Sequence, residues 1–259
     1  MVQLKYFDSH CHVHFPQFDA DREAVLARMR EKDMGAVLIG TDLATSTAAL
    51  ELAQQHDFLW ASVGLHPNDN PNEHFDISKY EELAKDPKVV AIGECGLDYF
   101  RSKPDGQKDR FEIQIALAQK LNKALVVHCR EAHDDMLQML FSYSAELKNN
   151  KLVVIMHFFT GSGELAQKYL DFGCYLSFPG PITYTDMYDE SIRVCPLDKM
   201  LIETDAPFAA PMPFRGKRNE PVYVEYVAAK IATVKGISVE EVAHQTVLNT
   251  QRIFSLTDR

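Results

Sequence analysis

Residues 88–128 read KVVAIGECGLDYFRSKPDGQKDRFEIQIALAQKLNKALVVH and contain the repeating unit of the fold. The stretch begins with an apolar, β-branched run at 88–93 and ends with a second such run at 124–128. Between them, residues 107–121 place apolar side chains at helical spacing. A strand, a helix and a second strand in this order predict a βαβ unit, in which the two strands are parallel.

The same unit recurs along the whole chain. Further apolar runs, which make eight in all, lie at 4–8, 36–40, 58–64, 152–157, 174–178 and 199–204. Helical periodicity also occurs at 22–32, 46–56, 134–148 and 164–172. Because the runs are continuously apolar, we expect strands buried on both faces of a parallel sheet covered by helices. Eight such units predict a (β/α)8 TIM-type barrel, an α/β fold.

A doubly wound open sheet is the alternative architecture. The chain has no GxGxxG or GxxxxGK[ST] phosphate loop, and this weakens that alternative. The last segments, 222–235 and 238–254, have the pattern of two more helices. Because no linker or repeat divides the chain, we expect residues 1–259 to form one domain, a common size for a barrel.

Composition and charge narrow the function classes. The chain has 259 residues, of which 46% are hydrophobic and 25% charged, as in a soluble globular protein. Its net charge of −10 argues against a protein that coats DNA, since such binding uses a basic surface. A nucleic-acid substrate, bound weakly and transiently, stays compatible with this charge if bound cations reverse the field locally.

The cysteines and the apolar runs indicate the compartment. The number of cysteines is odd and no CxxC pair occurs, so we expect reduced thiols in a cytoplasmic protein. Lys5 and Asp8 interrupt any signal-peptide pattern, and no apolar run is long enough to span a membrane. We therefore expect no membrane association and no obligate protein partner. The cysteines are Cys11, Cys95, Cys129, Cys174 and Cys195.

Histidines and carboxylates follow the predicted strands. His10 and His12 close the first strand and point to the same side of it, so both can reach one metal ion. Five more such residues follow later strands, and in a barrel these carboxyl ends meet at one mouth. We therefore predict a metal site there. The five residues are His66, Glu94, His128, His157 and Asp205.

The kinds of ligand suggest the metal. Imidazole nitrogen and carboxylate oxygen together leave Zn, Mn or Mg open. Four of these histidines, His10, His12, His128 and His157, together with the two carboxylates are more than one ion usually needs, so we predict two divalent ions. Glu94 is the most central candidate for a carboxylate that bridges them.

Seven motifs give the chain a family resemblance. The sequence resembles the TatD family of metal-dependent deoxyribonucleases, within the amidohydrolase-like barrel superfamily. The motifs occur in the family's order and span nearly the whole chain. They are DSHCH at 8–12, GLHP at 64–67, GECGLDYF at 93–100, HCREA at 128–132, HFFTG at 157–161, ETDAPF at 203–208 and RGKRNEP at 215–221.

The resemblance implies roles for the matched residues. His10, His12 and Asp205 would hold one ion, and His128 and His157 the second. Glu94 would bridge the two ions. His66 and Arg130 would face the substrate phosphate. Asp205 would also take a proton from the attacking water.

The chain departs from the family pattern at two positions. His14 stands where relatives often have an acidic residue, and Phe214 stands where many have histidine. Beyond Glu94, Asp98 and Tyr99 have either a substrate-side role or a loop-structuring one. The basic stretch 215–219 either contacts a nucleic-acid backbone or anchors its loop, for example through an ion pair with Glu220.

These observations together predict an enzyme. We expect a metal-dependent hydrolase of ester bonds, most specifically a deoxyribonuclease that cleaves DNA from an end. One alternative is a hydrolase of a small phosphoester, lactone or amide on the same barrel. A second is a metal-stabilised scaffold without turnover, which would have no use for a carboxylate beside an open metal position.

Overall fold

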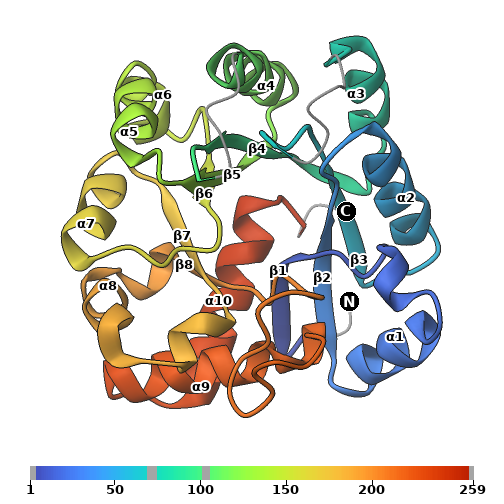
Figure 1. The fold of residues 1–259 in the computed structure, drawn as a ribbon, viewed down its shortest axis with the longest axis vertical. Helices are drawn as coiled ribbons and strands as arrows, with labels where there is room; N and C mark the ends of the chain where they lie inside the picture. Colours follow the sequence, from blue (N-terminus) through green and yellow to red (C-terminus); the bar gives the residue numbers. More distant parts are fainter. Residues whose placement is uncertain (1–3, 69–74, 101–105, 257–259) are drawn as a thin grey trace.

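The computed structural model describes residues 4–68, 75–100 and 106–256. Eight parallel strands form one sheet in which each strand pairs with the next along the chain (Figure 1). All eight overlap the apolar runs that predicted them, although the strands over 6–11 and 89–98 extend three and five residues beyond the runs at 4–8 and 88–93. Their bounds are β1 Tyr6–Cys11, β2 Met34–Ile39, β3 Leu59–Val63, β4 Val89–Asp98, β5 Ala124–Arg130, β6 Val154–Met156, β7 Tyr175–Phe178 and β8 Met200–Ile202.

The sheet curves until its last strand meets its first. Just beyond β8, the backbone N–H of Asp205 donates to His10 O at 2.9 Å, and His12 N–H donates to Ala206 O at 2.7 Å. A doubly wound sheet would instead reverse its strand order at a switch point. The strand order and this closure confirm the predicted TIM-type barrel.

Helices surround the barrel and differ from the prediction in three places. The segment predicted as one helix over 134–148 is two helices, α5 and α6, separated by Ser142 and Tyr143. Two short helices, α3 and α8, were not predicted. The bounds are α1 Arg22–Glu31, α2 Leu43–Gln54, α3 Ile77–Ala84, α4 Gln107–Leu121, α5 His133–Phe141, α6 Ser144–Lys148, α7 Gly163–Asp171, α8 Asp189–Val194, α9 Val224–Lys235 and α10 Val239–Ile253.

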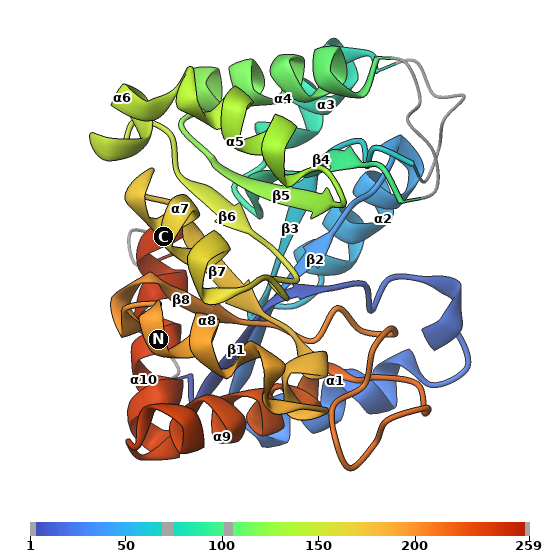
Figure 2. The same ribbon diagram turned by 60° about the vertical axis from the view of Figure 1, so that its left-hand side comes forward.

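The core has two layers, and α10 closes one end of the barrel. The larger layer lies between the strands and the surrounding helices. The smaller lies inside the barrel, where strand residues such as Phe7 and Val126 join Val247 and Phe254 at the C-terminal end of α10. Figure 2 shows α10 across the end where strands begin, with the loop after β8 at the opposite end. The open mouth is therefore the end where the strands finish.

No helix within the described residues has both the length and the apolar character needed to cross a membrane.

Candidate metal centre

The predicted ligands converge at the mouth of the barrel. Most of them lie near the carboxyl end of a strand or just beyond it, and Glu94 lies in the middle of β4. His10 comes from β1 and His128 from β5, while His12, His66, His157 and Asp205 follow β1, β3, β6 and β8. Among the described residues, four overlapping groups of His, Asp and Glu have ligand atoms within 4.8 Å of one another.

Glu94 lies at the centre of these groups. Its Oε1 is 2.8 Å from His157 Nε2 and 2.9 Å from His128 Nδ1. Its other oxygen, Oε2, is 3.3 Å from His10 Nε2. The two carboxylate oxygens of Glu94 therefore face different imidazoles, Oε1 those of His128 and His157 and Oε2 that of His10.

The first set consists of His10, His12 and Asp205. Asp205 Oδ1 lies 3.2 Å from His12 Nε2 and 3.5 Å from His10 Nε2. The Nδ1–H of His12 donates to Ile39 O at 2.8 Å, and this leaves Nε2 to face the centre. Asp205 has a φ of 56°, in the left-handed region that residues other than glycine rarely adopt. Such backbone strain is concentrated at functional sites.

The second set consists of Glu94, His128 and His157. Nδ1 of His128 lies 3.3 Å from Nε2 of His157, so two ring nitrogens converge beside one carboxylate oxygen. The opposite ring nitrogen of His128, Nε2, is 3.2 Å from Asp98 Oδ2. Asp98 thus fixes the orientation of a candidate ligand while its Oδ1 accepts from the N–H of Phe100.

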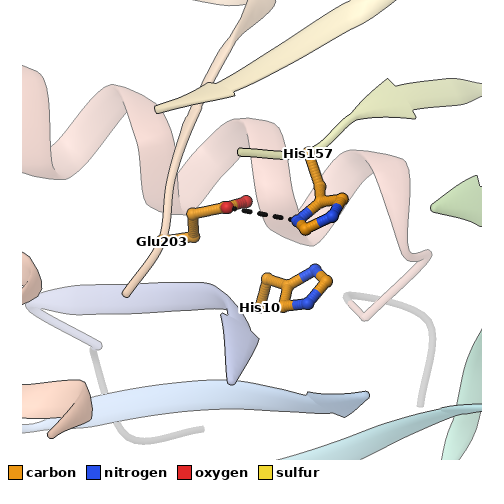
Figure 3. Close-up of side chains that lie close together, drawn as sticks. All are labelled: His10, His157 and Glu203. Atoms are coloured by element: carbon orange, nitrogen blue, oxygen red, sulfur yellow. Dashed lines mark ion pairs between the residues drawn. The ribbon is translucent and has the colours of Figure 1, made fainter. Parts of the chain in front are cut away.

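Glu203 lies beside His157 in a further group with His10, and sequence reasoning missed it. Its Oε1 lies 3.4 Å from His157 Nδ1 and accepts a hydrogen bond from Phe158 N–H at 2.8 Å (Figure 3). The ring of His10 stacks on His157 with centroids 4.0 Å apart. The one signal in the sequence was a charged residue directly after a buried strand, two positions before Asp205.

The carboxylates and imidazoles of the centre shift one another's pKa values in opposite directions. Burial alone would raise the pKa of Glu94, but the imidazoles of His157 and His66 lower that pKa well below its usual range. Burial works in the opposite direction on His157, whose pKa Glu94 and Glu203 raise well above its usual range. A divalent cation can replace the protons that these groups hold, because ligand sites bind either protons or metal.

His10 tests whether these residues fit a metal ion. Its side chain is 1% exposed, and among the described residues Nδ1 has no hydrogen-bond partner, while Nε2 has only the carboxylates of Glu94 and Asp205 nearby, at 3.3 and 3.5 Å. A buried polar nitrogen without a partner costs free energy, and burial lowers the pKa of His10 and so favours the neutral, metal-binding form. The mixed nitrogen and oxygen donors suit Zn or Mn. The residues present therefore fit a divalent metal.

His66 lies at the edge of the centre, in a candidate ligand group with Asp98 and His128, and Arg130 is the last residue of β5. His66 Nδ1 accepts from the N–H of Asn68 at 3.1 Å, so a neutral ring carries its proton on Nε2, which is 3.5 Å from Glu94 Oε1. Arg130 is exposed, and its guanidinium lies 3.6 Å from the ring centroid of Phe100. His66 thus directs an N–H donor toward Glu94, and Arg130 keeps an exposed guanidinium at the end of β5.

Tyr99 and Arg218 have structural contacts. The hydroxyl of Tyr99 donates to Asp135 Oδ2 at 2.6 Å, and burial together with this bond raises the pKa of Tyr99 to about 12. Arg218 forms a two-bond ion pair with Asp21 and also reaches Glu220 at 3.3 Å. Of the two roles considered for the basic stretch 215–219, its Arg218 therefore has the anchoring one.

The two departures from the family pattern have different surroundings. Phe214 stacks on Tyr223, with ring centroids 4.0 Å apart and planes 5° from parallel. His14 is buried, and neither of its ring nitrogens has a hydrogen-bond partner among the residues described. Its ring centroid lies 6.0 Å from that of His12.

Several known proteins are similar to this chain in sequence over nearly their whole length. A family model described as "TatD related DNase" matches residues 7–255. The "Uncharacterized metal-dependent hydrolase YabD" of Bacillus subtilis is 43% identical and covers 96% of this chain and 99% of its own. The "3'-5' ssDNA/RNA exonuclease TatD" of Erwinia tasmaniensis is 35% identical and covers 96% and 100%.

A solved structure gives the same result. The crystal structure of YJJV, a TatD homologue from Escherichia coli K12, superposes with a TM-score of 0.88 at 28% identity and covers 98% of this chain and 99% of its own. The family model, the relatives and the solved structure all indicate the same family. The chain belongs to the TatD family, and it is a metal-dependent hydrolase.

Proposed function

We propose that this hydrolase is a nuclease that removes nucleotides from an end of single-stranded DNA, with two divalent ions in its centre. The observation that carries the proposal is the position of Glu94, whose two oxygens face separate ligand sets 2.8–3.3 Å away. The Erwinia relative named as a single-strand exonuclease, at 35% identity over 96% of this chain, supports the choice of substrate.

The ligand sets divide between two ions. His10, His12 and Asp205 would hold one, His128 and His157 the other, and Glu94 both. Divalent ions in such a pair lower the pKa of bound water and offset charge on the attacking and leaving oxygens of a phosphodiester.

Side chains of the protein would accept the proton, bind the phosphate and position the ligand rings. Asp205, which is partly exposed, accepts the proton of the attacking water at its carboxylate. Nε2–H of His66 and the guanidinium of Arg130 bind the nonbridging oxygens of the scissile phosphate. Asp98 and Glu203 hold the rings of His128 and His157 in place.

A digestion assay tests this proposal. Metal-stripped protein receives Mg, Mn or Zn in turn, together with end-labelled single-stranded DNA, and products are resolved by length over time. We expect a ladder that shortens from one end. The Asp205→Asn variant should keep its circular dichroism spectrum and lose turnover. Intact DNA with every ion would refute the nuclease assignment and direct the search to small phosphoesters, lactones and amides.

A further inference from the structure

The loop that follows β8 exposes apolar side chains next to the metal centre. Phe208 and Met212 are each 47% exposed. The ring centroid of Phe208 lies 6.1 Å from that of His12, a candidate ligand. The backbone N–H of Phe208 donates to Asp205 O at 2.9 Å. Exposed apolar groups beside an active site indicate a surface that a ligand covers.

This loop is held firmly in place. The side-chain amide of Asn219, which is fully buried, donates to Thr204 O and to Phe208 O at 2.7 Å each. From the neighbouring loop after β7, the hydroxyl of Tyr184 donates to Ala210 O at 2.6 Å. The exposure of Phe208 is therefore a fixed feature of the mouth rather than the result of a frayed end.

Cations accompany these apolar groups. The guanidinium of Arg215 lies 4.5 Å from the ring centroid of Tyr184. Arg215 and Lys217 are exposed, and within the part of the chain that the structure describes neither forms an ion pair. Two cations without carboxylate partners, in a chain of net charge −10, form a local surface suited to phosphate groups.

We propose that Phe208, Tyr184 and Arg215 form a stacking surface for the nucleobases of a single strand, next to the scissile phosphate. The inference rests on the proposed nuclease function and names the residues that select the substrate. Bases of a single strand can stack on aromatic rings and guanidinium planes, whereas bases in a duplex already stack on one another. Arg215 and Lys217 contact the backbone phosphates of the nucleotides next to the stacked bases.

Binding to a slowly hydrolysed strand tests the surface apart from catalysis. The probe is fluorescein-labelled oligothymidylate with phosphorothioate linkages, and the readout is fluorescence anisotropy with Mg present. Because one base stack is worth about 1–3 kcal/mol, Phe208→Ala should raise Kd roughly 5- to 150-fold. Phe208→Tyr should restore most of the affinity. Phe141→Ala is the matched control, since Phe141 is 68% exposed on α5.

Salt dependence separates the cations from the rings. Arg215→Ala should reduce the slope of log affinity against log salt by about 0.7, the value for one phosphate contact on a single strand. Phe208→Ala should weaken binding at every salt concentration without changing that slope. Gel filtration of both variants shows whether the loop instead joins two copies of the chain.

The outcomes distinguish this inference from the proposed function. Wild-type protein that cuts no DNA but binds the probe, with binding weakened in Phe208→Ala, would support the stacking surface and refute the nuclease. Equal binding by wild type and Phe208→Ala overturns the stacking surface whether or not DNA is cut. No binding by wild type overturns it too, as does a change of oligomeric state in the variants.

Discussion

We predict that Glu203 determines which nitrogen of His157 can face a metal ion. It lies 3.4 Å from Nδ1, and the opposite nitrogen, Nε2, points at Glu94. Partners of this kind orient a ligand ring and raise its basicity, and their loss typically lowers metal affinity roughly 10- to 100-fold. We expect that loss in Glu203→Gln, measured by calorimetric titration of metal-stripped protein. Unchanged affinity would show that Glu203 does not position His157.

Arg130 is expected to act through the shape of its guanidinium as well as its charge. The group lies over the ring of Phe100, 3.6 Å from its centroid, and a guanidinium can bind two phosphate oxygens at once, as lysine cannot. Hydrogen bonds to charged groups are worth about 1.5–3 kcal/mol, so Arg130→Ala should lower kcat/KM for single-stranded DNA roughly 10- to 150-fold. Arg130→Lys should recover only a small part. Full activity of Arg130→Lys would contradict the two-oxygen contact.

The ligand residues could be predicted because each directly follows an apolar run, and strand ends in a barrel share one mouth. Glu203 could not. It lies between Ile202 and Thr204 and is close to a second carboxylate, Asp205. Which of the two faces the centre depends on how the chain leaves β8, and a left-handed φ at Asp205 changes that direction. The roles of these residues as ligands stay predictions until metal is titrated.

At the scale of elements, the strands were easier to predict than the helices. A strand buried on both faces has a continuous apolar pattern. Six of the eight strands are buried at every residue, β3 has one partly exposed residue, and β5 becomes exposed only at its carboxyl end. Helices α3 and α8 have eight and six residues, too few for a clear period. The contact of Arg218 with Asp21 joins residues 197 positions apart, and nothing in the local pattern near either residue indicates it.

That ion pair ties the loop after β8 to the start of α1, and its strength should depend on pH. The two hydrogen bonds from Arg218 lower the pKa of Asp21 below its ordinary value of 3.8. A carboxylate with a lowered folded pKa stabilises the protein above the unfolded pKa, and the effect is lost as pH falls through the folded value. The Tm of Asp21→Asn should therefore be below that of wild type at pH 7.

The Tm difference between wild type and Asp21→Asn should shrink as the pH falls below 3.8. Thermal melts at several pH values measure it. Glu164→Gln removes an exposed pair with Lys168 inside α7 and is the matched control, since a pair within one helix holds no loop. A difference that persists unchanged at low pH would mean that Asp21 acts through something other than its charge.

At the scale of the whole molecule, the barrel brings buried imidazoles and carboxylates from six strands to one point. That arrangement exists only in the folded chain, so a divalent ion should bind the native state and stabilise it. An ion at 100 times its Kd adds about 2.7 kcal/mol. For a protein of this size each kcal/mol shifts Tm by roughly 2–4 °C, so Mn or Zn should raise the Tm of stripped protein by about 5–11 °C.

Histidine variants show whether this rise comes from the predicted centre. His157→Asn removes a candidate ligand and should abolish most of the rise in Tm. His244→Asn changes an exposed histidine on α10 and should keep it. If both variants keep the full rise, the ion stabilises the protein from elsewhere, and the ligand sets around Glu94 are not where it binds. If only His157→Asn loses it, metal binding and the stability of the barrel depend on the same buried residues.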